Sequence, residues 1–162
     1  MFTRPIIDSL DFARKGMEVS GEVPMAELPR MAELLTDTVG SISYVLRGFE
    51  ANNAKPLLKL VLNGQCNLHC QRCLKTLFYP IKLVSNLRLV SEGELDESDI
   101  NDDQTDSIPA EKRLDVLALI EEELLLSLPI APKHELGECE ISAEGLSRSD
   151  SPFAVLTGLK KK

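Results

Sequence analysis

Cysteine and histidine are the residues of this sequence best suited to chemistry, and three of the four cysteines lie close together. Cys66, Cys70 and Cys73 fall in the stretch CNLHCQRC, with His69 between the first two. Their C-x3-C-x2-C spacing is typical of radical enzymes that hold an iron-sulfur cluster on three thiolates. Such enzymes enclose their cofactor in a large βα barrel, whereas this chain has 162 residues and a strand pattern follows the motif. An iron-sulfur enzyme is therefore a remote alternative.

A redox-active pair is the second chemistry that Cys70 and Cys73 could perform. Catalytic Cys-x-x-Cys pairs lie where a strand leads into a helix, because the helix N-terminus lowers the pKa of the thiol. The sequence around this pair instead predicts a strand, a turn and another strand. Thiol-redox catalysis is a remote alternative as well.

Zinc is the third possibility and suits the position of the pair better. A Cys-x-x-Cys turn between two strands presents two thiolates at the spacing of a tetrahedral zinc site, which then needs two further ligands. The loop after Pro132 offers them. The predicted structural site consists of Cys70, Cys73, His134 and Cys139, with Cys66 as a spare buried thiol. The alternative is that all four cysteines are small apolar residues and that His134 is a surface imidazole.

Three β-strands are predicted to position the cysteines. Apolar residues alternate with polar ones over 42–47, 58–70 and 77–89, which is the period of half-buried strands. We expect these strands to form an antiparallel sheet with one apolar face. Gly64 is predicted to mark a bulge or a twist in the long middle strand.

Shorter elements are predicted before this sheet. Residues 8–15 resemble a short helix capped by Asp8 or Ser9, and residues 17–23 alternate like a further strand. After Pro24 the sequence favours a helix that is interrupted at Pro29.

A longer helix is predicted after Asp115, which is a suitable N-cap, and it must end before Pro129. Its apolar residues recur at helical spacing at Leu117, Ile120, Leu124 and Leu128. The carboxylates of residues 121–123 are predicted to form the solvated side of this helix, because consecutive helical residues point in different directions and make a poor acid-base pair.

These elements predict an α+β fold: a small antiparallel β-sheet or open barrel with a C-terminal helix packed on it. Residues 1–140 are expected to form a single domain. Residues 141–162 are predicted to be a flexible tail made of a linker and a short amphipathic segment with Phe153, Leu156 and Leu159 on one side.

Charge is unevenly distributed along the chain. The formal net charge is -8, but nine carboxylates and no basic residue lie in residues 92–111. This segment repels itself and is nearly free of large apolar groups, so it is predicted to be a mobile acidic loop. Residues 38–91 are basic in contrast, with seven Lys or Arg residues and Glu50 as the only acid.

The strand residues opposite in parity to the apolar face include cations and aromatic rings. Such a combination on a sheet can follow phosphates and stack unpaired bases, which predicts an RNA-contact surface. The predicted contact residues of the sheet and of its hairpin turn are Arg47, Phe49, Lys59, Arg72, Lys75, Phe78, Lys82 and Arg88. The alternative is an ordinary solvated sheet face.

Other function classes have no support in the sequence. It contains no nucleophile elbow, no phosphate-binding glycine loop and no His-Glu-x-x-His motif, so we expect neither an enzyme nor a small-molecule substrate. No stretch approaches the roughly 20 apolar residues that span a bilayer, and the N-terminus lacks the apolar core of a signal peptide. We therefore expect a cytoplasmic protein without a membrane partner.

Three stretches resemble the YceD family of large ribosomal RNA subunit accumulation proteins: CQRCLK, LDVLALIEEELLLSLPIAPKHELGEC and SPFAVLTGLKKK. The resemblance covers most of the chain from Leu58 onward and places the family's Cys-x-x-Cys on Cys70 and Cys73. It implies further family cysteines at or near His134 and Cys139, whereas Cys66 is not part of the family pattern.

The resemblance also implies a function. It indicates a non-enzymatic ribosome-biogenesis factor that supports the synthesis, processing or stability of 23S ribosomal RNA. The implied partner is this RNA, its precursor, or a large-subunit ribosomal protein. The alternative is a protein-interaction adaptor that docks through the C-terminal segment.

Overall fold

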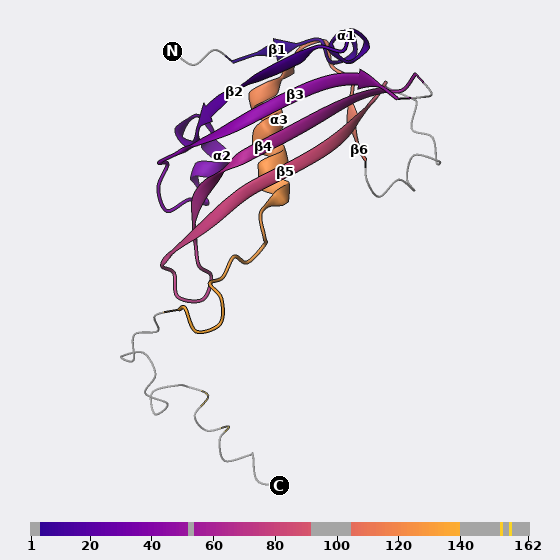
Figure 1. Ribbon diagram of the computed structural model, residues 1–162. Helices are drawn as coiled ribbons and strands as arrows, with labels where there is room; N and C mark the ends of the chain where they lie inside the picture. Colours follow the sequence, from indigo (N-terminus) through magenta and orange to yellow (C-terminus); the bar gives the residue numbers. More distant parts are fainter. Residues whose placement is uncertain (1–3, 52–53, 92–104, 140–152, 154–155, 157–162) are drawn as a thin grey trace.

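The computed structural model describes residues 4–51, 54–91, 105–139, 153 and 156. At its centre is a five-stranded sheet in the order β2-β3-β4-β5-β6. The strands are β2 (Glu18–Pro24), β3 (Ser41–Glu50), β4 (Pro56–His69), β5 (Thr76–Val90) and β6 (Asp106–Pro109). The sheet does not close into a barrel, and the helix α3 (Val116–Ser127) crosses one of its faces (Figure 1). The predicted α+β fold class is thus confirmed.

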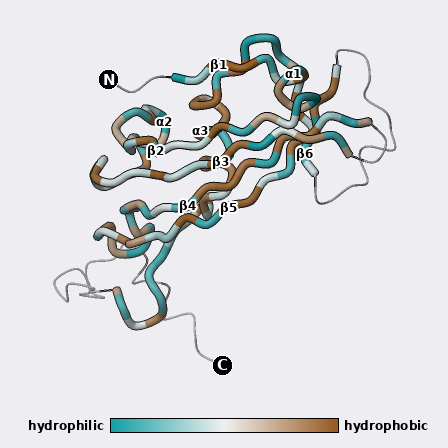
Figure 2. Tube along the Cα trace, turned by 45° about the horizontal axis from the view of Figure 1, so that its top comes forward, coloured by the Kyte–Doolittle hydropathy of each residue, from teal (hydrophilic) through white to brown (hydrophobic). Residues whose placement is uncertain are grey.

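The covered face of the sheet carries the apolar residues that the alternation predicted. Ile42, Leu46, Leu58, Leu60, Leu62 and Leu87 are fully buried there. From α3, the side chains of Leu117, Ile120 and Leu124 complete the core. Figure 2 shows the hydrophobic residues gathered along the central strands and α3. One apolar sheet face packed on one helix is therefore the main source of stability.

The N-terminal elements close one end of this core. α1 (Ser9–Arg14) begins at Asp8, whose side chain accepts the N–H of Asp11 at 3.1 Å. α1 packs closely on β3 at Gly48, where a Cβ atom would lie 2.4 Å from the carbonyl oxygen of Phe12. The helix predicted over residues 8–15 and the strand predicted over 17–23 are confirmed.

Two short helical pieces and a small second sheet complete the fold. The 3-10 helix η1 (Met25–Glu27) and α2 (Pro29–Ala32) follow β2, so the helix is interrupted before Pro29 as predicted. β1 (Ile6–Ile7) pairs with β7 (Leu114–Asp115), which ties the N-terminal residues to the start of α3.

α3 begins where the sequence predicted, because the Asp115 side chain accepts the N–H of Leu117 at 2.9 Å. The prediction that its three consecutive glutamates face solvent was wrong for two of them. Glu121 and Glu123 are each 7% exposed, the first bound to backbone amides of α2 and the second to the hydroxyl of Ser85. Hydrogen bonds offset the cost of burying both carboxyl groups. No helix in the described part of the chain is long enough to span a membrane.

Two further predictions need correction. The acidic segment 92–111 does not remain a loop throughout, because Asp106–Pro109 form β6, parallel to β5, which makes the sheet mixed. Residues 92–104 lie outside the described residues, as does the predicted tail 141–162 apart from Phe153 and Leu156.

Gly64 does not mark a bulge. Its strand pairs without interruption, with Gly64 opposite Ile42 on one side and Ile81 on the other. A Cβ atom on Gly64 would lie 2.9 Å from the carbonyl oxygen of Ser41, so glycine permits a close approach of β3 and β4.

Candidate metal centre and sheet face

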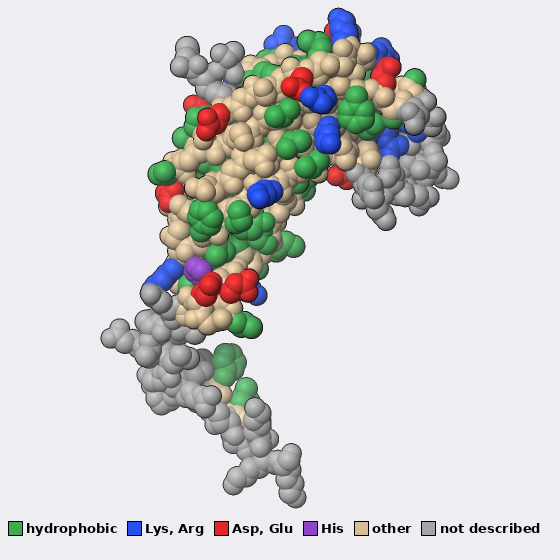
Figure 3. Space-filling model, viewed as in Figure 1, with side chains coloured by type: hydrophobic (Ala, Val, Ile, Leu, Met, Phe, Trp, Pro, Cys, Tyr) green, Lys and Arg blue, Asp and Glu red, His purple; other side chains and the backbone are tan. Residues whose placement is uncertain are grey.

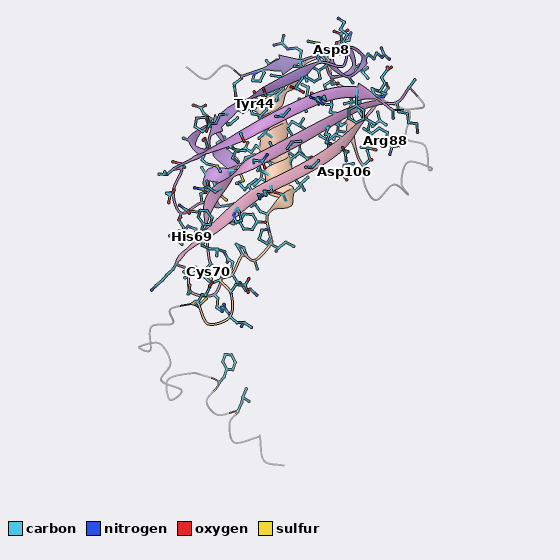
Figure 4. All side chains as sticks on the ribbon, in the orientation of Figure 1. Asp8, Tyr44, His69, Cys70, Arg88 and Asp106 are labelled. Carbon is cyan, nitrogen blue, oxygen red and sulfur yellow. The ribbon has the colours of Figure 1, made fainter. Side chains whose placement is uncertain are left out.

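The turn between β4 and β5 positions the first two candidate ligands. Cys70 closes it with two backbone hydrogen bonds: its N–H donates to the carbonyl of Lys75 at 2.9 Å, and its carbonyl accepts from Leu74 at 2.8 Å. Leu74 has a φ of 59°, which lets the chain reverse directly after Cys73. Figure 4 shows Cys70 at the end of the sheet, beside the segment that follows α3.

The segment after α3 supplies the other two candidate ligands. Pro129 prevents the helix from continuing, and the chain then approaches the turn, where the N–H of Gln71 donates to the carbonyl of Pro132 at 2.8 Å. Gly137, with a φ of 95°, reverses the chain between His134 and Cys139. Both side chains therefore face the two cysteines of the turn.

The structure brings together the four residues predicted as metal ligands. Among the described residues, the ligand atoms of Cys70, Cys73, His134 and Cys139 all lie within 4.8 Å of one another. The Sγ atoms of Cys70 and Cys139 are 3.7 Å apart, and His134 Nδ1 lies 3.4 Å from Cys73 Sγ and 3.7 Å from Cys139 Sγ. Tetrahedral zinc bonds imply about 3.8 Å between two sulfurs and about 3.5 Å between sulfur and nitrogen. The spacing of this Cys3His group therefore suits a metal ion.

Neighbouring groups hold these ligands in the right chemical form. His134 Nε2 lies 3.0 Å from the carbonyl oxygen of Thr76. A carbonyl can only accept, so Nε2 carries the proton and Nδ1 turns its lone pair toward the sulfurs. Arg72 donates from Nε to Cys139 Sγ at 3.0 Å and from Nη2 to the His134 carbonyl at 2.8 Å. Such second contacts orient ligands and balance thiolate charge.

The thiols differ in how readily they ionise without a metal. Burial alone would raise the pKa of Cys70, but the backbone amides of Cys73, His134 and Arg72 outweigh it and lower this pKa to about 5. The Lys75 amide lowers the pKa of Cys73, yet burial and the neighbouring sulfurs raise it overall. The hydrogen bond with Cys139 raises the pKa of His134. Cys70 rather than Cys73 is therefore the thiol that ionises more readily before a metal binds.

Cys66 does not join this group. It is 3% exposed within the apolar core, and burial raises the pKa of its thiol to about 11. A neutral core thiol is a poor metal ligand. Among the described residues, the three-cysteine spacing therefore does not assemble into an iron-sulfur site.

The opposite face of the sheet carries six of the eight residues predicted to contact RNA. Arg47 on β3 lies directly opposite Lys59 on β4, and Lys82 on β5 lies opposite Asn63. All three cations are exposed, and no described helix covers them (Figures 1 and 3). Arg47 also donates from Nε to the Glu18 carboxylate at 2.6 Å.

The remaining predicted contact residues are less uniform. Arg88 lies on the same face but is only 7% exposed, and Phe49 is half-buried, whereas Phe78 is 58% exposed. Lys75 and Arg72 lie in the turn between β4 and β5, where Arg72 is engaged with Cys139. The sequence predicts Arg72 as an RNA contact, and it did not predict the hydrogen bonds of Arg72 to Cys139 and to the His134 carbonyl. Its position between Cys70 and Cys73 was the signal that could have shown this.

A row of valines crosses the middle of this face and was also missed. Val45, Val61 and Val84 are direct cross-strand neighbours, and Val45 and Val84 are 37% and 57% exposed. We call this surface, with Arg47, Lys59, Lys82 and Phe78, the outer sheet face.

Comparison with known proteins gives a family match. The family model of the large ribosomal RNA subunit accumulation protein YceD matches residues 58–160. The Large ribosomal RNA subunit accumulation protein YceD of Haemophilus influenzae is 27% identical to this chain, over 96% of the chain and 95% of the relative. No solved structure matches the chain significantly.

Proposed function

The chain belongs to the YceD family of large ribosomal RNA subunit accumulation proteins, and from this premise we propose that it supports accumulation of 23S ribosomal RNA. The proposed mode of action is non-enzymatic. The protein binds the large-subunit RNA or its precursor through the outer sheet face and thereby assists its synthesis, processing or stability. Support comes from the family, whose name states this process, and from the chemistry of the outer sheet face.

The observation that carries the RNA proposal is the direct pairing of Arg47 with Lys59. Like charges opposite each other on a sheet destabilise the fold, and Glu18 relieves only the Arg47 side. Such a conflict on a face that no described helix covers suits binding of a polyanion, which releases counterions when it meets paired cations. Lys82 on the next strand extends the same positive surface.

The exposed apolar groups of this face suit unpaired RNA better than duplex. Bases of single-stranded RNA stack on aromatic rings and on apolar surface. On the outer sheet face, Phe78 provides the ring and the valine row provides the apolar surface, close to the cations. A-form duplex would meet such a flat surface mainly through phosphates. We therefore propose single-stranded segments of the large-subunit RNA as the ligand.

Charge reversal tests this face. The double variant Lys59→Glu, Lys82→Glu should lower co-sedimentation with precursors of the large subunit by about tenfold or more, because two phosphate contacts become repulsive. The control is Lys112→Glu with Arg113→Glu, which makes the same change of charge at two exposed residues before α3. Equal co-sedimentation of both variants and the unchanged protein would reject the outer sheet face.

A second candidate function has its own observation. Phe153 and Leu156 are 71% and 55% exposed, and the N–H of Leu156 donates to the carbonyl of Phe153 at 3.0 Å. Two exposed apolar side chains on one turn suit an adaptor that docks on a ribosomal protein. In that case a chain that ends before Ser151 loses a protein partner, whereas the charge reversal leaves co-sedimentation intact.

Three finer features complete the proposal. We place the protein in the cytoplasm, we assign it no small-molecule substrate, and we take zinc as its cofactor, bound at the Cys3His group for structural rather than catalytic purposes. The donor set supports zinc, because thiolate and imidazole ligands suit it better than magnesium or calcium.

A further inference from the structure

We propose that the Cys3His group binds one zinc ion as a clasp, which fastens residues 129–139 to the turn between β4 and β5. The inference deepens the proposed function, since it rests on the zinc cofactor named there. It does not depend on RNA binding. The outer sheet face can therefore fail as an RNA-binding surface while the zinc site stands, and the zinc site can fail while RNA binding stands.

The number and type of ligands favour a closed structural site. Four protein atoms converge, namely three sulfurs and His134 Nδ1, so a tetrahedral ion would retain no open position for water or substrate. Catalytic zinc sites keep such a position open. The spacing of the sulfurs also differs from that of a disulfide, because Cys70 Sγ and Cys139 Sγ are 3.7 Å apart.

Two neighbouring groups complete the site in the manner of known metal centres. The Thr76 carbonyl fixes the proton of His134 on Nε2 and leaves Nδ1 for the metal. Three thiolates with one imidazole give a zinc complex a net charge of -1, and the Arg72 guanidinium, 3.0 Å from Cys139 Sγ, compensates it.

The clasp is needed because apolar packing does little for this segment. Its two large aliphatic side chains do not pack on the core: Ile130 is fully exposed and Leu136 is 90% exposed. Outside the Cys3His group, the segment is joined to the turn by hydrogen bonds to backbone groups: Gln71 N–H donates to the Pro132 carbonyl, and Arg72 donates to the carbonyls of His134 and Glu135. A zinc ion with ligands from the turn and from the segment would cross-link positions far apart in the sequence. Such a cross-link lowers the conformational entropy of the unfolded chain, much as a disulfide does.

Metal analysis of the full-length protein, purified without chelators, tests ligation. We expect about one zinc per chain, the stoichiometry of a single tetrahedral site. Cys73→Ser and Cys139→Ser should lose most of this zinc, whereas Cys66→Ala should keep it, because Cys66 lies outside the group. Should the serine variants fail to fold, Co²⁺ titration of the metal-free unmodified protein decides instead, since thiolate ligation gives intense tetrahedral absorption bands.

Three results would overturn the zinc site. They are unmodified protein that neither contains zinc nor forms the tetrahedral Co²⁺ complex, equal metal loss in Cys66→Ala and Cys73→Ser, and a Cys70–Cys139 disulfide in the protein as isolated. RNA co-sedimentation of the same preparations is read separately and does not enter this decision.

Limited proteolysis tests the clasp itself. Trypsin should cut after the exposed Lys133 at least tenfold faster once zinc is removed, because the segment then loses its attachment to the turn. Cleavage after Lys112, which lies outside the segment, serves as the control. A rate at Lys133 that does not respond to zinc would show that the ion does not fasten the segment.

Discussion

Leu74 occupies a backbone conformation that most residues avoid, directly after the second cysteine of the turn. Its φ of 59° lies in the left-handed region, and its side chain is 72% exposed, so leucine gains little there from packing. Glycine adopts this conformation without the steric cost of a Cβ atom. We expect Leu74→Gly to raise the free energy of unfolding by about 1 kcal/mol, measured by urea denaturation of metal-loaded protein.

The matched control for this change is Leu136→Gly. Leu136 is 90% exposed and has no left-handed backbone, so glycine there should leave stability unchanged or lower it slightly. Equal destabilisation by both variants would show that the turn stores no strain at Leu74.

At the scale of single residues, the sequence predicted the candidate ligands but not the groups that support them. Cys70 and Cys73 stood out because a Cys-x-x-Cys turn between two strands presents two thiolates at the spacing of a zinc site. His134 and Cys139 followed as a second pair of donors. The supports could not be predicted, because one is the backbone carbonyl of Thr76 and the other is the direction of the Arg72 side chain. Both depend on how two distant loops meet.

Among the helices, α2 depends on a carboxylate that comes from α3. α2 has no side-chain cap of its own, and Glu121 Oε1 accepts the N–H groups of Arg30 at 2.6 Å and Met31 at 3.1 Å. Free amides at a helix N-terminus favour a negative group. We expect Glu121→Ala to lower the free energy of unfolding by about 2 kcal/mol, measured by urea denaturation.

Glu122→Ala is the control for this contact, since Glu122 lies on the same helix but is exposed. It should change stability by less than about 0.5 kcal/mol, as surface substitutions usually do. If the two variants lose equal stability, Glu121 acts only through the helix propensity of α3 and does not cap α2.

An element could be predicted from the sequence when a regular fraction of its residues faces the core. β3 buries every second residue, and β4 and β5 follow the same alternation less strictly, so the pattern of all three is plain in the sequence. β6 has no such pattern, because Asp106–Pro109 form a short edge strand with no buried residue. β6 forms by parallel pairing with the edge of β5, so it depends on tertiary contacts. The acidic sequence around it does not indicate a strand.

At the scale of the whole molecule, the buried apolar core and the exposed cations lie on opposite faces of one sheet. α3 covers the apolar face, which leaves Arg47, Lys59 and Lys82 on a face that no described helix covers (Figure 3). The strand alternation predicted this division before the fold was known, since residues of opposite parity must face opposite sides. It did not predict the burial of Arg88 at 7% exposure or the ion pair of Arg47 with Glu18. The proposed RNA-contact surface is therefore smaller than the one predicted from the sequence.

Crosslinking in living cells, followed by sequencing of the RNA bound to the protein, tests the central claim most directly. We expect enrichment of large-subunit ribosomal RNA or its precursor over small-subunit RNA, at unpaired segments, and loss of this enrichment in the Lys59→Glu, Lys82→Glu variant. RNA recovery no greater than that of an unrelated acidic protein, or equal recovery of both ribosomal RNAs, would contradict it.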